Sequence, residues 1–373
     1  MKATWMVAAV LAGCAGCGGL DRDPAPSGPA LQCDALKPSG VASCDLVAPE
    51  AVVLARIAPL PGEDSGANGF HVASDGAFLY YVSESRVFRL AVGGGEPEAL
   101  TASGSAGGSF GLADGWLYWT KDRVVSRMPA EGGDVETLLE LPEEVGWSVV
   151  PDAILWWRYA GEAEPLRRFR ISTGETTDLW SSPADQGIRG AATDGEHVYM
   201  ALTTDLVRIP LEGGATEVLS AYGGALGPTP QVVRGILELT NEHVYFAGSG
   251  PGPQPDGSEG HGPRILRATK AAPHTVDSAA DGFAARMAIH AGALFADLAV
   301  PVSGEEAHGA IVRVAPDGTV EPIADSDLTV GAAVISWASD GLVASDCWVY
   351  FNLRCGEDSS HRLVAMPNPA STR

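Results

Sequence analysis

The feature that most constrains this chain is an internal repeat with a period of about 40 residues. One copy, residues 113–139, contains an Asp-Gly pair, an aromatic stretch, an Arg-containing stretch and a Gly-Gly pair. Residues 193–219 and 74–100 have the same features in the same order. The position of the first turn recurs at Gly76, Gly115, Ala153, Gly195, Glu242, Gly292 and Gly341, at intervals of 39, 38, 42, 47, 50 and 49 residues. Such self-similarity is typical of an array of small structural units.

Each unit predicts four antiparallel strands, which we call A to D. The Asp-Gly pair predicts a two-residue hairpin between strands A and B, and the aromatic and β-branched stretch predicts strand B. Four short strands in about 40 residues form one blade of a β-propeller. The sequence therefore predicts an all-β fold with a single propeller of seven four-stranded blades, with six or eight blades as alternatives.

The two ends of the repeat predict how the ring closes. The last unit contains three strands, at residues 333–338, 348–353 and 362–366, and lacks the fourth. Residues 50–57 predict a strand that belongs to no unit. Pairing of this strand with the last blade would bury both exposed edges. We expect the propeller to span residues 49–369, followed by a short tail at 370–373.

The N-terminus has the pattern of an export signal. Lys2 precedes an apolar run over residues 3–13, which is too short to span a bilayer as a helix. The run ends at Leu11-Ala12-Gly13-Cys14, which resembles the lipobox of bacterial lipoproteins. That resemblance implies a signal peptide over residues 1–14, acylation of Cys14, and a lipid anchor at the cell envelope, at the periplasmic face or the outer membrane. A plain signal peptide cleaved near Ala15 is the alternative. Residues 15–48, rich in Gly and Pro, predict a flexible tether.

Apart from Cys14 and Cys17, four cysteines remain, and they agree with export. Cys33 and Cys44 lie close in sequence, as do Cys347 and Cys355. We favour these two local disulfides, the first forming a small loop in the tether, although four cysteines allow three connectivities.

The charge of the chain excludes one class of partner. There are 47 acidic and 24 basic residues, so the net charge is −23. This field would repel a phosphate backbone, so we predict no binding of nucleic acid. We also predict no cofactor, and contact with the membrane only through the lipid anchor.

The second unit carries a family resemblance. Its Leu117-Tyr118-Trp119-Thr120 stretch, followed by Arg127 and by a Gly-Gly pair, resembles the repeat of YWTD-type propellers and related bacterial propellers. Lys121 stands where that family has Asp. The resemblance covers residues 50–369 in outline. It implies a propeller used for contact with a protein or a glycan, and it implies no reaction.

Candidate binding residues lie where the repeat is interrupted. The B–C connections of units five to seven are longer than the others, and in propellers these connections share one face with the D–A connections. Each insert combines carboxylates with a histidine, which suggests a basic ligand or a metal, although surface loops are commonly acidic. The residues are Asp256, Glu259, His261, Glu305, Glu306, His308, Glu357, Asp358 and His361.

Two other patterns have structural explanations. An arginine recurs on strand C, at Arg89, Arg127, Arg170, Arg208, Arg267 and Arg313. A ring of arginines could bind an anion, but repetition in every unit favours a structural pair with an acidic neighbour. Residues 107–111 match the G-x-S-x-G pattern of a nucleophile elbow. That elbow requires a helix after the serine, and here we expect strand A, so the match is interpreted as chance.

The functional prediction follows from these features. We expect a binding or scaffold module at the cell envelope that engages a protein or glycan through its loop-rich face. The alternative is a propeller hydrolase or lyase with a site in the central funnel, for which His71, His197 and His290 are the titratable groups to examine. His197 and His290 lie beside A–B turns, at the opposite end from that funnel site. A deep, non-repetitive funnel pocket with converging histidines and carboxylates would favour the enzyme.

Overall fold

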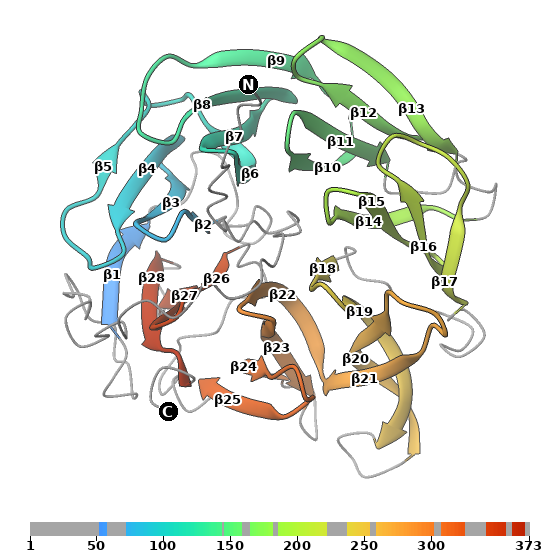
Figure 1. Cartoon of the computed structure of the whole chain (residues 1–373). Coiled ribbons are helices and arrows are strands. Elements are labelled where there is room, and N and C mark those ends of the chain that lie inside the picture. The colour runs from blue at the N-terminus through green and yellow to red at the C-terminus, as the bar shows by residue number, and fades with distance from the viewer. Residues whose placement is uncertain are drawn as a thin grey trace, which may run out of the picture.

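The structure is a computed structural model and describes residues 52–57, 72–143, 145–158, 165–181, 186–221, 237–253, 259–301, 307–324, 341–355 and 360–369. Within these ranges the chain forms 28 strands in seven four-stranded antiparallel sheets. The sheets are arranged as blades around a common centre (Figure 1). The prediction of a seven-bladed β-propeller is confirmed.

Blades 1 to 4 follow one another along the chain, each with strands A to D in order. Blade 1 contains β2 (Val72–Ser74), β3 (Phe78–Ser83), β4 (Arg86–Ala91) and β5 (Glu98–Ala99). Blade 2 contains β6 (Gly107–Ala113), β7 (Trp116–Lys121), β8 (Val124–Pro129) and β9 (Glu136–Glu140). Blade 3 contains β10 (Val145–Val150), β11 (Ala153–Arg158), β12 (Pro165–Arg170) and β13 (Glu175–Ser181). Blade 4 contains β14 (Ile188–Thr193), β15 (His197–Leu202), β16 (Asp205–Pro210) and β17 (Glu217–Ala221).

Blades 5 to 7 have longer strands B and C. Blade 5 contains β18 (Leu237–Leu239), β19 (His243–Pro253), β20 (Glu259–Thr269) and β21 (Val276–Asp281). Blade 6 contains β22 (Phe283–His290), β23 (Ala293–Pro301), β24 (Ala307–Val314) and β25 (Val320–Ala324). Blade 7 contains β26 (Leu342–Ala344), β27 (Trp348–Cys355), β28 (Ser360–Pro367) and, from the start of the chain, β1 (Val52–Ile57).

The ring closes as the sequence predicts. Strand β1 pairs antiparallel with β28, with Val52 opposite Ala365 and Val53 opposite Val364. The order in the last sheet is therefore β1-β28-β27-β26, and a strand from the N-terminal side supplies the missing outer strand. Figure 1 shows β1 beside the last blade. Closure removes the free edge that an open array would leave.

The core lies between neighbouring blades. One cluster combines Tyr199 and Leu206 of blade 4 with Leu239 and Phe246 of blade 5, all at most 1% exposed. The clusters at the other seams are built in the same way, which explains why strand B is aromatic and β-branched in nearly every unit. Because each sheet covers the apolar face of the next, no blade is stable alone.

The A–B connections are of two kinds. In blade 2 Ala113 pairs with Trp116 across a two-residue turn, and Asp114 and Gly115 both have positive φ (49° and 75°), as a type I′ turn requires. In blade 1, however, Ser74 pairs with Leu79 across four residues. Blades 4, 5 and 7 also have the four-residue connection. The prediction of a two-residue hairpin in every unit is therefore wrong for these four blades.

The seventh unit differs from the prediction in its first strand. Strand A is β26, which follows Gly341, whereas residues 333–338 lie outside the described residues. Gly341 therefore precedes the strand, and the turn begins at Ser345, whose hydroxyl accepts a hydrogen bond from the Trp348 N–H at 3.1 Å. Serine can terminate the strand here because its side chain replaces the Asp cap of other units.

The geometry of β27 excludes one predicted disulfide. Cys347 immediately precedes this strand and Cys355 is its last residue. Eight residues of strand separate their Cα atoms by about 26 Å, whereas a disulfide requires less than about 7 Å. The Cys347–Cys355 pairing is therefore wrong. If all four cysteines pair, both remaining connectivities link the last blade to Cys33 and Cys44.

The predicted signal peptide with Cys14 and the tether with Cys33 and Cys44 lie outside the described residues. Within the part of the chain that the structure describes, no helix has the length and apolar character needed to cross a bilayer.

Candidate functional site

The recurring strand C arginines form ion pairs within their own blades. In blades 1, 2, 4, 5 and 6 the arginine binds a carboxylate on strand D. The pairs are Arg89–Glu98 at 2.8 Å, Arg127–Glu136 at 2.8 Å, Arg208–Glu217 at 2.7 Å, Arg267–Asp277 at 2.6 Å and Arg313–Glu321 at 2.9 Å. The interpretation of these arginines as structural pairs is confirmed.

The third blade corrects one assignment. In blade 2 Arg127 lies opposite Tyr118, the third residue of strand B, and in blade 3 the residue opposite the third position, Leu155, is Arg168. Arg170, which the sequence comparison selected, lies two residues further along. Arg168 and Arg170 both bind Glu212 of blade 4, at 3.0 and 2.9 Å.

These arginines also join neighbouring blades. Arg89 Nη1 donates to the Glu131 carbonyl at 3.2 Å, Arg168 Nη1 to the Leu211 carbonyl at 2.8 Å, and Arg208 Nη1 to the Lys270 carbonyl at 3.2 Å. Each acceptor lies in the C–D turn of the following blade. The arginines therefore stabilise the seams of the ring.

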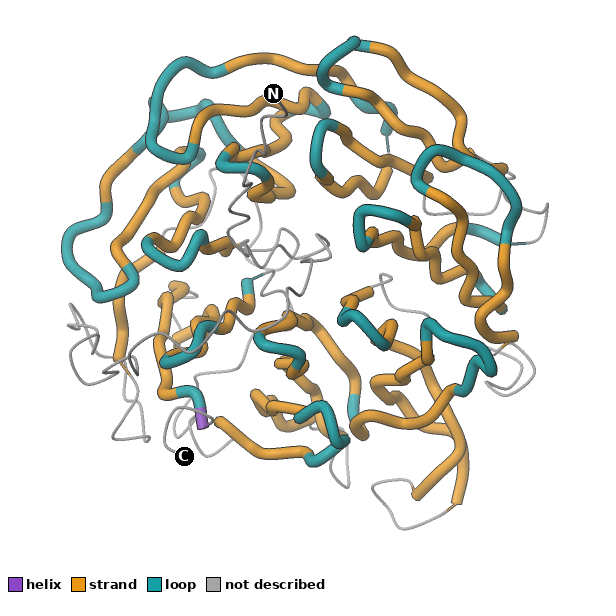
Figure 2. The backbone as a smooth tube through the Cα atoms, viewed as in Figure 1, coloured by secondary structure: helices purple, strands orange, loops and turns teal. Residues whose placement is uncertain are grey.

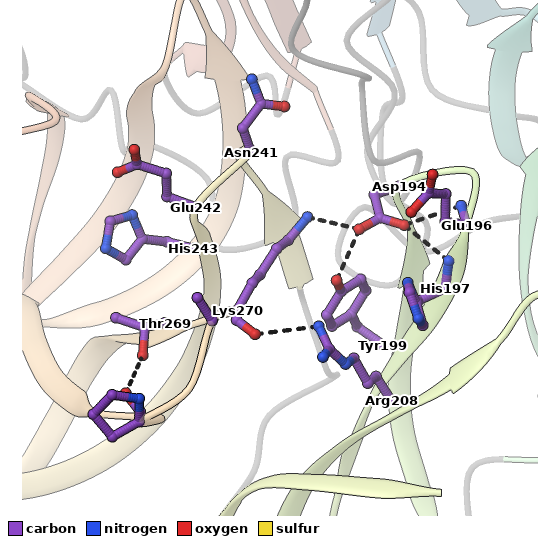
Figure 3. Close-up of a pocket in the computed structure, with 12 residues that line it drawn as sticks. Asp194, Glu196, His197, Tyr199, Arg208, Asn241, Glu242, His243, Thr269 and Lys270 are labelled. Carbon is purple, nitrogen blue, oxygen red and sulfur yellow. Dashed lines mark hydrogen bonds and ion pairs between the residues drawn. The ribbon is translucent and has the colours of Figure 1, made fainter. Parts of the chain in front are cut away.

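A cavity of about 610 Å³ lies at the seam between blades 4 and 5. Its walls are the A–B turns of both blades and the C–D turn of blade 5, so it opens at the A–B end of the ring (Figure 3). His197, which the sequence placed beside an A–B turn, is one of its lining residues. This non-repetitive cavity is not in the funnel where the enzyme alternative would need it.

Asp194 is the centre of the polar network in this cavity. Its Oδ1 accepts hydrogen bonds from the backbone N–H groups of Glu196 (3.1 Å) and His197 (2.9 Å). Its Oδ2 accepts from the Tyr199 hydroxyl (2.8 Å) and from Lys270 Nζ (2.9 Å), as the dashed lines in Figure 3 mark. Burial alone would raise the pKa of the carboxyl, but these donors outweigh it and lower the pKa to about 2.

Lys270 crosses the seam from blade 5 to reach this carboxylate. Its side chain is 9% exposed, and Nζ lies 4.7 Å from the centroid of the Tyr199 ring, a cation–π contact. Burial lowers the pKa of the ammonium, and the hydrogen bond and charge of Asp194 partly offset that shift. Among the described residues, Asp194 Oδ2 is the one side-chain acceptor for this ammonium, which has three N–H donors.

Lys270 interrupts the repeat. It is the residue after strand C, and its N–H donates to the Glu242 carbonyl just as the Leu211 N–H donates to the Glu196 carbonyl in blade 4. The equivalent residues in the other six blades are uncharged. Counted by register from the first residue of strand B, they are Val92, Ala130, Ile171, Leu211, Pro316 and Asn368.

Two histidines form opposite walls of the cavity. His197 and His243 are the first residues of β15 and β19, and their rings contact Tyr199 and Tyr245 at centroid distances of 6.3 and 6.1 Å. Burial and the nearby Arg267 charge lower the pKa of His243. The equivalent position in the other blades holds an aromatic or alanine. Those residues are Phe78, Trp116, Ala153, Ala293 and Trp348.

The register of blade 5 explains why the sequence did not reveal the cavity. Thr240 Oγ1 accepts the His243 N–H at 3.0 Å, so Thr240 occupies the place of Asp194, and Asn241 that of Gly195. The sequence comparison aligned Glu242 with Gly195, one residue too late. In addition, Asp194 and Lys270 are 76 residues apart, and no local pattern relates them.

The predicted loop residues are on or beside the three long B–C hairpins. Glu259 and His261 are on β20, His308 on β24 and His361 on β28, while Asp256, Glu305, Glu306, Glu357 and Asp358 lie outside the described residues. Strands β19 and β20 have 11 residues each, compared with six in β15 and β16. The predicted lengthening in blades 5 to 7 is confirmed, and Figure 1 shows the β19–β20 hairpin projecting beyond the ring.

Other candidates have ordinary structural roles. Among the described side chains there is no group of three or more His, Cys, Asp or Glu that could hold a metal ion. Residues 107–111 belong to strand β6 itself rather than to a preceding loop, and no helix follows them in blade 2. His290 binds Asp346 at 2.8 Å across the seam between blades 6 and 7, and His71 lies outside the described residues.

The chain matches no known family model and no curated protein sequence. It is similar in structure to the CNH domain of AfRom2, with a TM-score of 0.53 and 10% identity over 85% of this chain and 99% of that one. The WD40 domain of Neurospora crassa Pan2 has a TM-score of 0.53, with 11% identity over 85% of this chain and 96% of that one. The extracellular domain of a protein described as the hybrid two-component system BT4673 from B. thetaiotaomicron has a TM-score of 0.54 at 13% identity, over 83% of this chain and 39% of that one. These similarities establish the propeller fold. Figure 2 shows the seven groups of strands around the centre, joined by loops and turns where the connections are described.

Proposed function

We propose that the protein is a binding or scaffold propeller, exported and lipid-anchored at the cell envelope, which engages a protein or glycan through the B–C hairpins of blades 5 to 7. The observation that supports this is the length of these hairpins. Strands β19 and β20 exceed the six-residue strands of blade 4 by five residues each, which extends the hairpin by about 16 Å.

The described part of β19 reaches the core through its first residues. Among residues 243–248, whose side chains are described, Val244, Tyr245 and Phe246 are buried. The second half contains glycine and proline at residues 248–253. Long projections from a rigid scaffold are where binding residues concentrate. Because three consecutive blades share this feature, the hairpins can form one continuous recognition surface.

The similar structures are consistent with this proposal, since one is an extracellular domain and another a WD40 domain. The enzyme alternative would require a funnel site. The cavity at the seam of blades 4 and 5 lies outside the funnel, at the A–B end of the ring, and lends no support to this alternative.

The proposal is tested by shortening one hairpin. Replacement of residues 249–263 by Asn-Gly would leave six residues in each strand, 243–248 and 264–269, as in blade 4. A matched control replaces Thr203-Thr204, in the turn between β15 and β16, by Asn-Gly. Affinity capture from envelope extract and binding to a glycan array should show loss of partners in the shortened variant and retention in the control. Capture of the same partners by both variants would refute the role of this hairpin.

The anchor is tested separately. Cys14→Ser should move the protein from the membrane fraction to the soluble fraction, and mass spectrometry of the wild-type N-terminus should show an acylated Cys14. An unmodified N-terminus at Ala15 would support the plain signal peptide instead.

A further inference from the structure

We propose that the cavity at the seam of blades 4 and 5 binds a small zwitterion that carries both a carboxylate and an ammonium group, of the class of a free amino acid or a short peptide. This site is at the A–B end of the ring, away from the long hairpins, so the inference is independent of the proposed function. Its volume of about 610 Å³ is within the usual range for small-molecule sites.

At the floor of the cavity the Lys270 ammonium offers hydrogen-bond donors to a ligand. The Asp194 carboxylate already accepts four hydrogen bonds, two on each oxygen. Its charge is balanced by Lys270, and the charge of Arg208 is balanced by Glu217. The two further N–H bonds of the Lys270 ammonium remain for a ligand, and their natural partner is a carboxylate.

The rim has the opposite character. Glu196 and Glu242 belong to the A–B turns of blades 4 and 5 and are exposed. Among the described residues neither carboxylate has an ion-pair partner, and Figure 3 shows the two on opposite sides of the cavity. A ligand whose cationic group lies at this rim, with its anionic group at Lys270, satisfies both ends.

The equivalent seam of blades 1 and 2 shows that the ring does not need this chemistry. There Asp75 and Tyr80 form the same hydrogen bond, at 2.6 Å, but Ala130 replaces Lys270 and Phe78 replaces His197. That seam is closed by a continuous apolar cluster. This position in the repeat holds a buried charge at one seam and an apolar residue at the other. A ligand explains the buried charge better than folding does.

The experiment is calorimetric titration of the full chain with each of the standard amino acids and with the dipeptide Gly-Gly. The single-ended probes ethylamine and acetate serve as comparisons. We expect at least one zwitterion to bind, and both single-ended probes to bind at least about tenfold more weakly, because each lacks one charge-assisted contact. No binding by any zwitterion at millimolar concentration, or equal binding by ethylamine or acetate, would overturn the inference.

Variants locate the site. Glu196→Gln with Glu242→Gln should weaken binding at least about tenfold, since only rim charges change. Because Lys270→Leu alone could perturb the fold, the paired variant Lys270→Leu with Asp194→Asn places leucine where blade 4 has Leu211, and it should abolish binding. The control Asp75→Asn, at the seam without a cavity lysine, should bind as the wild type does. Retained binding in the paired variant would refute the site, and the hairpin-shortened protein should still bind the zwitterion.

Discussion

The seam between blades 1 and 2 and the seam between blades 4 and 5 share most of their polar groups but differ in one buried charge. In both, an aspartate accepts two turn N–H groups and a tyrosine hydroxyl, and a strand C arginine donates to the next blade. Only the second seam adds Lys270, which binds the aspartate from the neighbouring blade. The repeat therefore supplies a local turn cap, and one substitution converts that cap into an ion pair between blades.

The largest expected difference between the seams follows removal of the aspartate. Asp194→Ala would leave the buried Lys270 ammonium without its counter-charge. It should reduce the free energy of unfolding by about 3 kcal/mol. Asp75→Ala removes a cap without exposing a buried charge and should reduce it by about 1 kcal/mol. Urea denaturation measures both. Equal losses would show that Lys270 adds no stabilisation across the seam.

The next largest effect is the loss of stability in acid that protonation of Asp194 causes. The folded pKa of Asp194, about 2, is below its unfolded value, so the stabilisation is complete above about pH 4 and is lost as the pH falls towards 2. The contribution is about 2 kcal/mol at neutral pH. Unfolding free energies measured between pH 2 and 6 should fall less steeply for Asp194→Asn than for the wild type. Parallel curves would contradict the depressed pKa.

A smaller effect is expected for the lysine. Lys270→Leu removes one of four hydrogen bonds to Asp194 and places an apolar residue where Leu211 already fits in blade 4. The expected loss is about 1 to 2 kcal/mol, below that of Asp194→Ala, because the carboxylate keeps three donors. Thermal unfolding in the same buffer compares the two variants. A larger loss than for Asp194→Ala would mean that Asp194 depends on Lys270 more than Lys270 depends on Asp194.

The smallest difference concerns the tyrosines. Tyr199→Phe and Tyr80→Phe each remove one hydroxyl that donates to the turn aspartate, at 2.8 and 2.6 Å. Each should lower the free energy of unfolding by about 1 kcal/mol. The two values should agree within error, since this part of the seam is common to both. A clear excess at Tyr199 would mean that its contact with Lys270 contributes as well.

The predictions from sequence were most accurate where a pattern repeats. Seven turn signals and aromatic strands predicted seven blades, and the unpaired strand at residues 50–57 predicted the closure with β28. The pairing of strand C arginines with acidic neighbours was also predictable, because both residues recur at fixed spacing. Errors arose where the turn letters varied. Arg170 was chosen in place of Arg168, and Glu242 in place of Asn241, since one or two residues of slip leave the pattern almost unchanged.

What the sequence determined by itself is the architecture of this protein, because a short period of turns and strands permits few ways to bury apolar faces. Only the tertiary structure decided which side chains meet at the seams. Asp194 and Lys270 come together because the consecutive blades 4 and 5 pack face to face. Cys347 and Cys355 are separated because the extended strand β27 holds its ends apart. Contacts between units depend on the packing of whole sheets, and such packing leaves no spacing signal along the chain.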